Sequence, residues 1–436
     1  MINLSPPSLL ALGFAFFIIL GTFLLKLPIS HHGDLRWMDA FFTATSAVTI
    51  TGLATIGLDT HLTLFGQFIV LLLIQAGGLG FMTFAILVAL TLSPKLGLKQ
   101  QIFAQNTLGQ TSLASVKSIT FNLLIYTLAF ECIGFLILTA YWAPIYGFEY
   151  GAFYAFFYSV SAFNNAGFSL FSDGLLKFRH DLGIFYVLSG LYIIGGTGFI
   201  VLMDIKKNRS WKKISTNSKI ILSGMLVLNT VAFILIYLLE QNNPLTLGHM
   251  SVFEKITHAW FHATVPRSSG FNSVDMAALT PASIFLTAIL MFIGGGSLST
   301  AGGIKIGTFV ILILTVITFF RSGDEVTVFK RSISPESSFK ALAVAFATCI
   351  YIVLGVFVIL IFDPKLDFLS VLFEVISAVC TVGLSRGITG QLSDQSLSVI
   401  CFLMFAGRLG PITLIYLIAS SKKSHVRHPN AEIQIG

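Results

Sequence analysis

The chain has 436 residues, of which 55% are hydrophobic and only 10% are charged. Soluble domains carry about 25% charged residues. This composition and a mean hydropathy of +0.88 therefore exclude a soluble protein and indicate a multi-pass membrane protein. The 4 cysteines all lie in apolar segments without metal-ligand spacing, which predicts small core residues.

Apolar runs long enough to cross a bilayer, which takes about 20 helical residues, occur throughout the chain. Eight stand out, at 8–27, 62–92, 118–140, 182–203, 218–239, 280–320 with an interruption, 340–362 and 395–420. The first run lacks a preceding basic region and a small-residue cleavage site, so we expect a retained span rather than a signal peptide. Four shorter apolar segments lie at 37–48, 152–163, 254–265 and 367–379. A helix of about 12 residues is only about 18 Å long, too short to cross.

Most basic residues fall in four of the segments between these runs. They are Lys95, Lys99 and Lys117; Lys206, Lys207, Arg209, Lys212, Lys213 and Lys219; Arg321, Lys330, Arg331 and Lys340; and Lys422, Lys423 and Arg427. With eight spans, all four segments lie on one side, which the positive-inside rule makes cytoplasmic. We therefore expect both termini in the cytoplasm. Membrane orientation already explains the basic runs, so we expect no nucleic-acid partner.

One pattern recurs four times, around Gly52, Gly167, Gly270 and Gly383. A small hydroxyl residue stands six positions before each glycine, and an aromatic residue stands ten positions before it. A single glycine after an apolar helix is commonly a helix C-cap, but four copies in matched contexts indicate an internal repeat. The predicted units are repeat 1 at 1–95, repeat 2 at 96–210, repeat 3 at 211–330 and repeat 4 at 331–420, followed by a cytoplasmic tail at 421–436.

Each unit predicts a long helix, a re-entrant half-helix, an extended stretch that contains the glycine, and a second long helix. Non-helical backbone survives at membrane depth only where it is buried in protein or lines a wet cavity. We therefore predict an all-α fold with eight transmembrane helices and four re-entrant half-helices around one central pore.

The four extended stretches predict a selectivity filter for a cation. Backbone carbonyls can replace the hydration shell of a potassium ion, and glycine permits the backbone angles that this requires. The partly negative C-terminal ends of the half-helices also favour a positive charge at the axis. The predicted filter, with K⁺ at its backbone carbonyls, comprises Ile50, Thr51, Gly52, Leu53, Asn165, Ala166, Gly167, Phe168, Ser268, Ser269, Gly270, Phe271, Thr381, Val382, Gly383 and Leu384.

A second glycine motif occurs in the second long helix of each unit. Close helix packing through small residues explains the simpler copies. In repeat 3 the motif continues as a glycine-rich loop at 294–307, through which no helix should persist. This loop lacks the GxxxxGK[ST] spacing of a phosphate-binding loop, so we predict a break of the backbone inside the membrane.

In repeat 4, Arg408 replaces one glycine of this motif. A charge inside a span is costly and marks a functional site. At about 5 Å and an effective dielectric of about 20, it would repel a potassium ion by about 3 kcal/mol. The alternative is a buried pairing of Arg408 with loop carbonyls. The predicted gate comprises Gly294, Gly295, Gly296, Ser297, Thr300, Gly302, Gly303, Lys305 and Arg408.

At these residues the chain resembles the Trk/Ktr/HKT superfamily of potassium transporters over nearly its whole length. The resemblance rests on the glycine stretches, chiefly Thr381-Val382-Gly383-Leu384, on Arg267-Ser268-Ser269-Gly270-Phe271-Asn272, and on the loop. The first span begins near residue 8, directly before the first half-helix. The chain is therefore most similar to KtrB-type membrane subunits, without the two extra N-terminal spans of Trk-type members.

The resemblance implies M1–pore-helix–M2 repeats and, because Gly52 is a glycine, selectivity for potassium. It implies a loop that obstructs the pore below the filter. Arg267 resembles the arginine that this family commonly has in its third filter, and we expect it to lie behind the strand as a hydrogen-bonding brace rather than in the pore. It also implies a homodimer in the plasma membrane, regulated by a cytoplasmic ring of nucleotide-binding RCK subunits (KtrA/KtrC-like). The chain itself would hold no cofactor. The basic loops at 204–219 and 321–340 are candidate docking surfaces.

Several alternatives stay open. Strict coupling of potassium to sodium or protons would need paired acidic residues at mid-membrane, where only Glu131 is a candidate, and a hydrogen bond between helices is its simpler role. Activation by sodium is also open. His258 and His262 share a helix face and predict packing or a metal pair, and Glu374 is expected to bond its neighbours. An enzyme would need a nucleophile with a base or a metal cluster facing a cavity, and we find neither pattern.

Overall fold

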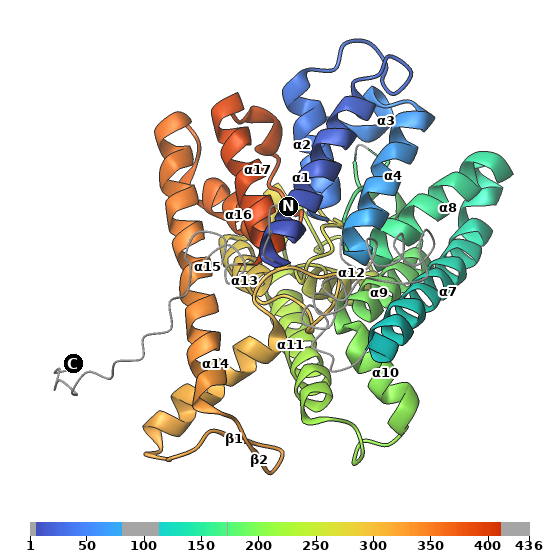
Figure 1. Ribbon diagram of the computed structural model, residues 1–436. Helices are drawn as coiled ribbons and strands as arrows, with labels where there is room; N and C mark the ends of the chain where they lie inside the picture. Colours follow the sequence, from blue (N-terminus) through green and yellow to red (C-terminus); the bar gives the residue numbers. More distant parts are fainter. Residues whose placement is uncertain (1–5, 81–112, 172, 411–436) are drawn as a thin grey trace, which may run out of the picture.

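The computed structural model describes residues 6–80, 113–171 and 173–410, and almost all of its regular structure is helical (Figure 1). Within these ranges a two-stranded hairpin, β1 (Thr327–Val328) and β2 (Arg331–Ser332), is the one sheet. The helices are α1 (Pro6–Leu25), α2 (Trp37–Val48), α3 (Leu58–His61), α4 (Leu64–Leu79), α7 (Leu113–Tyr146), α8 (Phe148–Phe163), η1 (Leu176–Phe178), α9 (Leu182–Thr197), α10 (Phe199–Asn208), α11 (Thr216–Glu240), α12 (Val252–Thr264), η2 (Met276–Ala278), α13 (Pro281–Phe292), α14 (Ile306–Phe320), α15 (Pro335–Phe362), α16 (Phe368–Val379), η3 (Thr389–Gln391) and α17 (Asp394–Leu409).

The long helices that begin each unit are long and apolar enough to cross a membrane. Among the described residues these are Ser8–Leu25, Thr120–Tyr146, Thr216–Glu240 and Pro335–Phe362, with a fifth span if α9 and α10, bent by 89°, count as one. Exposed side chains such as Phe16, Phe121, Leu226 and Phe346 line their outer faces, which suits contact with lipid. The prediction of an all-α multi-pass membrane protein is confirmed.

The second helices of the units are shorter or broken. α4 and α17 end beside residues outside the described ranges, so the predicted runs 62–92 and 395–420 are only partly visible, and the tail 421–436 is not described. α13 and α14 are separated by a non-helical segment, as the glycine-rich sequence predicts. The observed break spans 293–305 rather than 294–307, because Ile306 and Gly307 already belong to α14.

The four short helices α2, α8, α12 and α16 each precede one of the glycine-containing segments. Each packs against the long helix before it, and the pairs α1·α2, α7·α8, α11·α12 and α15·α16 form extensive contacts. Side chains at several helix starts accept a backbone N–H and so fix the first turn. These caps are Thr63, Ser215, Ser251, Thr280, Ser334, Asp367 and Ser393.

Repeat 2 departs from the expected boundaries. α7 runs to Tyr146 instead of residue 140, and α8 begins at Phe148 instead of residue 152. The break is confined to Gly147, whose φ of +80° favours glycine. Trp142 packs on Tyr158 and Tyr146 packs on Tyr154, with ring centroids 5.0 and 5.2 Å apart. These aromatic contacts hold the helical continuation against α8.

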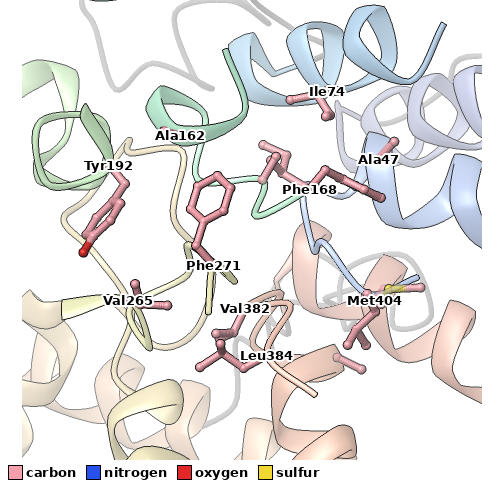
Figure 2. Packing of buried hydrophobic residues seen from close by; sticks show 14 of the residues in the cluster. Ala47, Ile74, Ala162, Phe168, Tyr192, Val265, Phe271, Val382, Leu384 and Met404 are labelled. Atoms are coloured by element: carbon pink, nitrogen blue, oxygen red, sulfur yellow. The ribbon is translucent and has the colours of Figure 1, made fainter. Parts of the chain in front are cut away.

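Buried residues from all four units form one large hydrophobic core. Figure 2 shows part of this core, where Phe168, Phe271, Val382 and Leu384 come from three of the glycine-containing segments. Basic loops lie elsewhere: the loop between α10 and α11 and the hairpin after α14 stand at the same end of the molecule (Figure 1). The core therefore includes the hydrophobic residues of the predicted filter. Two of the basic segments lie at one end of the molecule, and the membrane side of that end stays a prediction.

Candidate ion-conduction site

Each short helix leads into a glycine stretch, and we number these first to fourth: 49–53, 164–168, 267–271 and 380–384. In three of them the same backbone hydrogen bond closes the turn. The N–H of the residue before the glycine donates over 2.8 Å to the carbonyl of the hydroxyl residue six before the glycine; the pairs are Thr51 with Ser46, Ala166 with Ser161, and Val382 with Ser377. The recurring hydroxyl residues therefore have a structural role that the sequence pattern signals.

The serine hydroxyls hold the same turns. Ser46 Oγ accepts from the N–H of Gly52 and Ser377 Oγ accepts from the N–H of Gly383, each over 3.0 Å. Ser161 Oγ instead donates to the carbonyl of Phe168. In the third stretch Thr264 bonds back to its own helix and to Tyr192. The third stretch thus lacks the serine-to-glycine hydrogen bond.

Left-handed backbone alternates along all four stretches. The glycine and the residue two positions before it both have positive φ, although the earlier residue is never glycine. The values are 55° and 92° for Ile50 and Gly52, 58° and 68° for Asn165 and Gly167, 83° and 63° for Ser268 and Gly270, and 47° and 92° for Thr381 and Gly383. A left-handed residue with a side chain costs about 1–2 kcal/mol, so the surrounding bonds must enforce this path.

The four glycines close a ring. A Cβ atom added to each would come within 3.0 Å of the carbonyl oxygen just before the glycine of the next stretch. For Gly52, Gly167, Gly270 and Gly383 that carbonyl belongs to Ala166, Ser269, Val382 and Thr51 respectively. The contacts run from the first stretch to the fourth and back to the first. The ring thus leaves no room for a side chain at any of the four glycines.

A cavity of about 450 Å³ opens on one side of this ring. All four glycines line it, together with Leu53, Phe168 and Leu384. Near its rim, Asp39 accepts hydrogen bonds from Thr55 Oγ1 and from Arg36 Nε, each over 2.8 Å. Burial raises the pKa of the Asp39 carboxyl, but these bonds outweigh burial and hold the pKa below its usual range.

The loop between α13 and α14, residues 293–305, is fixed to the break between α9 and α10. Its ends pair through a bridge between Ile293 and Ile304. The N–H of Gly296 donates to the carbonyl of Gly196 over 2.8 Å, and the N–H of Phe199 donates to Leu298 over 3.3 Å. The loop thus has a defined path, and Gly198, with φ of +98°, bends the neighbouring helix around it.

The same loop contacts three glycine stretches. Ser268 Oγ accepts from the N–H of Gly302 and donates to the carbonyl of Thr381, each over 2.8 Å. The Asn165 carboxamide hydrogen-bonds the hydroxyls of Thr300 and Ser269, each over 2.7 Å. The predicted gate and the predicted filter are therefore joined directly by side-chain hydrogen bonds.

Arg408 connects the loop to repeat 1. Its Nη1 donates to the carbonyl of Thr300 and its Nη2 donates to the carbonyl of Gly77, each over 2.8 Å. Lys305 Nζ donates to the carbonyl of Ala301 within the loop. The pairing of Arg408 with a loop carbonyl, left as an alternative from sequence, is present. It gives the arginine a means of holding the loop in place.

Glycines of the second motif pack against the half-helices. A Cβ at Gly77, Gly195 or Gly407 would come within 3.0 Å of the carbonyl oxygen that ends the preceding short helix, on Val48, Phe163 and Val379 respectively. Close packing through small residues therefore accounts for these positions. In repeat 3 the corresponding Gly294 packs on the loop itself, at the carbonyl of Gly302.

Arg267 is the residue expected to brace the third stretch from behind. Its side chain is buried, and Nη1 and Nη2 have no hydrogen-bond partner in the part of the chain that the structure describes. The role of Arg267 as a brace therefore stays a prediction.

The other polar residues that the sequence singled out, Glu131, His258 and His262, each hydrogen-bond a neighbouring residue. Glu131 accepts from Asn164 Nδ2 over 2.9 Å and from Gln75 Nε2 over 3.3 Å, and so links three helices. His258 Nε2 lies 2.9 Å from the carbonyl of Arg179, and His262 Nε2 lies 3.1 Å from Thr287 Oγ1. Among the described residues no cluster of three or more His, Cys, Asp or Glu side chains could hold a metal ion.

The sequence did not single out Tyr158 or Ser169. The Tyr158 hydroxyl lies 2.6 Å from Ser169 Oγ, just beyond the second glycine stretch. The available signal is positional: Tyr158 and Glu374 both stand nine residues before their glycine, and Ser169 and Ser385 both stand two residues after it. Comparing the four units position by position would have found this pair.

Residues 14–426 match the family described as TrkH, cation transport protein. The Ktr system potassium uptake protein B of Bacillus subtilis is 42% identical over 435 residues, covering 100% of this chain and 98% of that protein. The protein of the same name from Vibrio alginolyticus is 36% identical, covering 99% and 95%. The potassium/sodium uptake protein NtpJ of Enterococcus hirae is 35% identical, covering 100% and 98%.

The fold is similar to a solved structure, the potassium transporter TrkH from Vibrio parahaemolyticus. The TM-score is 0.74 at 20% identity, covering 96% of this chain and 86% of that one. At this identity the similarity shows the fold alone, and it agrees with the helical architecture described above. The family match and the identity to its relatives extend over essentially the whole chain, so this chain belongs to the TrkH family of membrane cation transport proteins, which are not enzymes.

Proposed function

We propose that this chain carries potassium ions into the cell through the ring formed by its four glycine stretches. The observation that carries the proposal is the closed contact cycle, in which each glycine lies against a carbonyl of the next stretch. Positive φ at the glycine and two residues before it recurs in all four stretches, so the four stretches present their backbone to the ring in the same way. Rings of carbonyl oxygens of this kind can replace the hydration shell of potassium. Relatives named for potassium uptake support the choice of ion.

The same proposal assigns the architecture. Each unit is an M1–pore-helix–M2 repeat, in which the short helix is re-entrant and the full chain has eight spans. The order of a long helix, a short helix, a glycine stretch and a second helix in all four units supports it. The cavity at the ring faces outward. The basic loops stand at one end of the molecule, which we assign to the cytoplasm with both termini, at the plasma membrane.

Below the ring, the intramembrane loop closes the pore. Gly302 packs so tightly on the fourth stretch that an added Cβ would overlap the carbonyl of Cys380. Arg408 fixes the loop to repeat 1 through the carbonyls of Thr300 and Gly77. Opening therefore requires the loop to leave the stretches and Arg408 to release at least one carbonyl.

In this proposal a partner regulates the chain, because the resemblance to KtrB-type membrane subunits implies a cytoplasmic regulatory ring. The chain forms a homodimer and receives a KtrA/KtrC-like ring of nucleotide-binding RCK subunits, with the basic loops at 204–219 and 321–340 as docking surfaces. Sodium acts as an activator rather than a coupled substrate, because Glu131 already bonds Asn164 and Gln75. The relative named for potassium and sodium uptake makes sodium worth testing.

Potassium uptake in potassium-auxotrophic cells tests the filter, with and without excess sodium. Parent, Gly383→Ser and Gly190→Ser are compared, with a regulatory ring co-expressed. We expect the parent to restore growth at low potassium and Gly383→Ser to lose preference for potassium, because its side chain would enter the ring. Gly190 has open space beside it and serves as the matched control. A Gly383→Ser variant that behaves like the parent would remove the filter from the proposal.

A further inference from the structure

The outer ends of the glycine stretches are not all held alike. The position nine residues before the glycine is occupied by Thr43, Tyr158, Phe261 and Glu374 in the four units. All four side chains are buried in the short helices behind the ring. Among the described residues, only Tyr158 and Glu374 of these four hydrogen-bond chain that follows the glycine. In the first unit, Asp39 at another position of the short helix bonds Thr55 instead.

In the fourth unit Glu374 Oε1 accepts a hydrogen bond from the Thr389 hydroxyl. Thr389 Oγ1 also lies 3.0 Å from Ser385 Oγ, two residues after Gly383. Glu374 is 1% exposed, and its other oxygen, Oε2, has no hydrogen-bond partner among the described residues. A buried carboxyl group in this position is costly, and the bond to Thr389 is the contact through which it acts on the chain.

The second unit makes the equivalent contact with a phenol. Tyr158 is fully buried, and its hydroxyl lies 2.6 Å from Ser169 Oγ and accepts from the N–H of Leu170 over 3.2 Å. Thr43 Oγ1 has no hydrogen-bond partner in the described chain. Phe261 packs on Phe185 and Tyr192 instead. Since the stretches contact one another in the order first to fourth, the two polar contacts lie on opposite sides of the ring.

The segments that these residues hold border the outer cavity. Ser169, Ser385 and Thr389 all line it, so on that side they face open space rather than packed protein. A segment with one open side is positioned by whatever holds its other side. The hydroxyls of Ser161 and Ser377 reach as far as Phe168 and Gly383. Beyond Gly383, Arg386 Nη1 also donates to Ser370 Oγ over 2.6 Å, but the hydrogen bonds to Ser169 and Thr389 come from Tyr158 and Glu374.

We propose that Glu374 is a positioning residue for ion specificity: by holding Thr389 and, through it, Ser385, it fixes the outer end of the fourth stretch. Tyr158 does the same for the second stretch through Ser169. The ring then keeps its carbonyl spacing from two opposite sides. This inference rests on the proposed function of the ring as a potassium filter. It adds the residues that fix the spacing of the carbonyls in that filter.

The test measures rubidium uptake into potassium-auxotrophic cells, normalised to protein in the membrane, and its inhibition by potassium and by sodium. Glu374→Leu and Thr389→Val each remove the contact, while Glu374→Gln keeps an acceptor oxygen of the same shape. We expect the first two to lower the preference for potassium over sodium about three- to tenfold, the range that one lost hydrogen bond gives. Glu374→Gln should recover most of that loss, and Tyr158→Phe should lower the preference by a similar factor.

Two further comparisons separate positioning from general damage. If Glu374 acts through Thr389, the double variant Glu374→Leu/Thr389→Val should lose no more preference than either single variant. Full preference in Thr389→Val, or an equal loss in Glu374→Gln and Glu374→Leu, overturns the inference. Gly383→Ser is run in parallel: if it loses potassium preference while Glu374→Leu and Thr389→Val keep it, the inference fails alone. If Gly383→Ser also keeps it, the proposed filter fails as well.

Discussion

The third and fourth glycine stretches follow similar backbone paths by different means. In the fourth, Ser377 at the end of the short helix holds both Val382 and Gly383 through its carbonyl and its hydroxyl. In the third, the corresponding Thr264 is bonded elsewhere, and Ser268 is held by the loop at 293–305 and by the carbonyl of Thr381. The fourth stretch is therefore supported by its own short helix, and the third is supported by the loop that we propose as the gate.

This difference explains why the third unit contains the break. Its second helix is divided into α13 and α14, and the chain between them supplies Gly302 to Ser268 and Thr300 to Asn165. Four-fold symmetry would give each stretch the same support and would give the ring no special connection to the loop. One irregular unit couples the conformation of the loop to the conformation of the ring. Variants that act on one of these two units and spare the other test this difference.

The largest effect is expected at Arg408. Arg408→Ala removes two charge-assisted hydrogen bonds, each contributing about 1.5–3 kcal/mol, and so should favour the open loop by about 100-fold or more. Arg408→Lys keeps a charge, but a single ammonium group cannot present the guanidinium fork to Thr300 and Gly77 at once. Potassium efflux from proteoliposomes without a regulatory ring measures the leak. Parent-like efflux from Arg408→Ala would contradict the gate, and parent-like efflux from Arg408→Lys alone would assign the effect to charge.

A smaller effect is expected where the loop meets the fourth stretch. Gly302→Ala places a Cβ against Thr381 Oγ1 and the carbonyl of Cys380, and overpacking of this kind costs about 1–3 kcal/mol. We expect the loop to be displaced, so that potassium efflux in the absence of a regulatory ring rises about tenfold. Potassium preference should fall to a smaller extent, because the N–H of Gly302 then leaves Ser268 Oγ. Gly307→Ala, which meets no neighbouring atom, is the control. If efflux from Gly302→Ala equals efflux from the parent, the contact between the loop and the fourth stretch does not keep the pore closed.

Much of the ring could be predicted from sequence because its chemistry is local. A hydroxyl residue six positions before a glycine can bond that glycine without help from distant chain, and Ser46, Ser161 and Ser377 do hold their own stretches. The glycine-rich stretch around Gly294 likewise signals a broken helix by composition alone. These features depend on short-range geometry, which spacing along the chain encodes.

The rest depends on contacts between distant residues. Arg267 was expected to make hydrogen bonds, but its terminal nitrogens have no partner among the described residues. The length of α7 depends on Trp142 and Tyr146 finding Tyr158 and Tyr154 across the α7–α8 contact. That Arg408 reaches Gly77, 331 positions away, cannot be read from spacing. Such pairings appear only once the units are placed beside one another.

The smallest effects are expected from substitutions of Ser268, which contacts both the loop and the fourth stretch. Ser268→Ala removes the bonds to Gly302 and Thr381, and Ser268→Gly removes them while relieving the strain of a φ of +83°. Two lost hydrogen bonds of about 0.5–1.5 kcal/mol each should raise efflux and lower potassium preference together, each several-fold, because the same hydroxyl supports the loop and the third stretch. Ser299→Ala removes a bond that stays within the loop, to the carbonyl of Gly296, and should change efflux alone. If Ser268→Gly keeps full preference, the third stretch holds its shape without the loop, and the coupling between gate and ring must run through Thr300 and Asn165 instead.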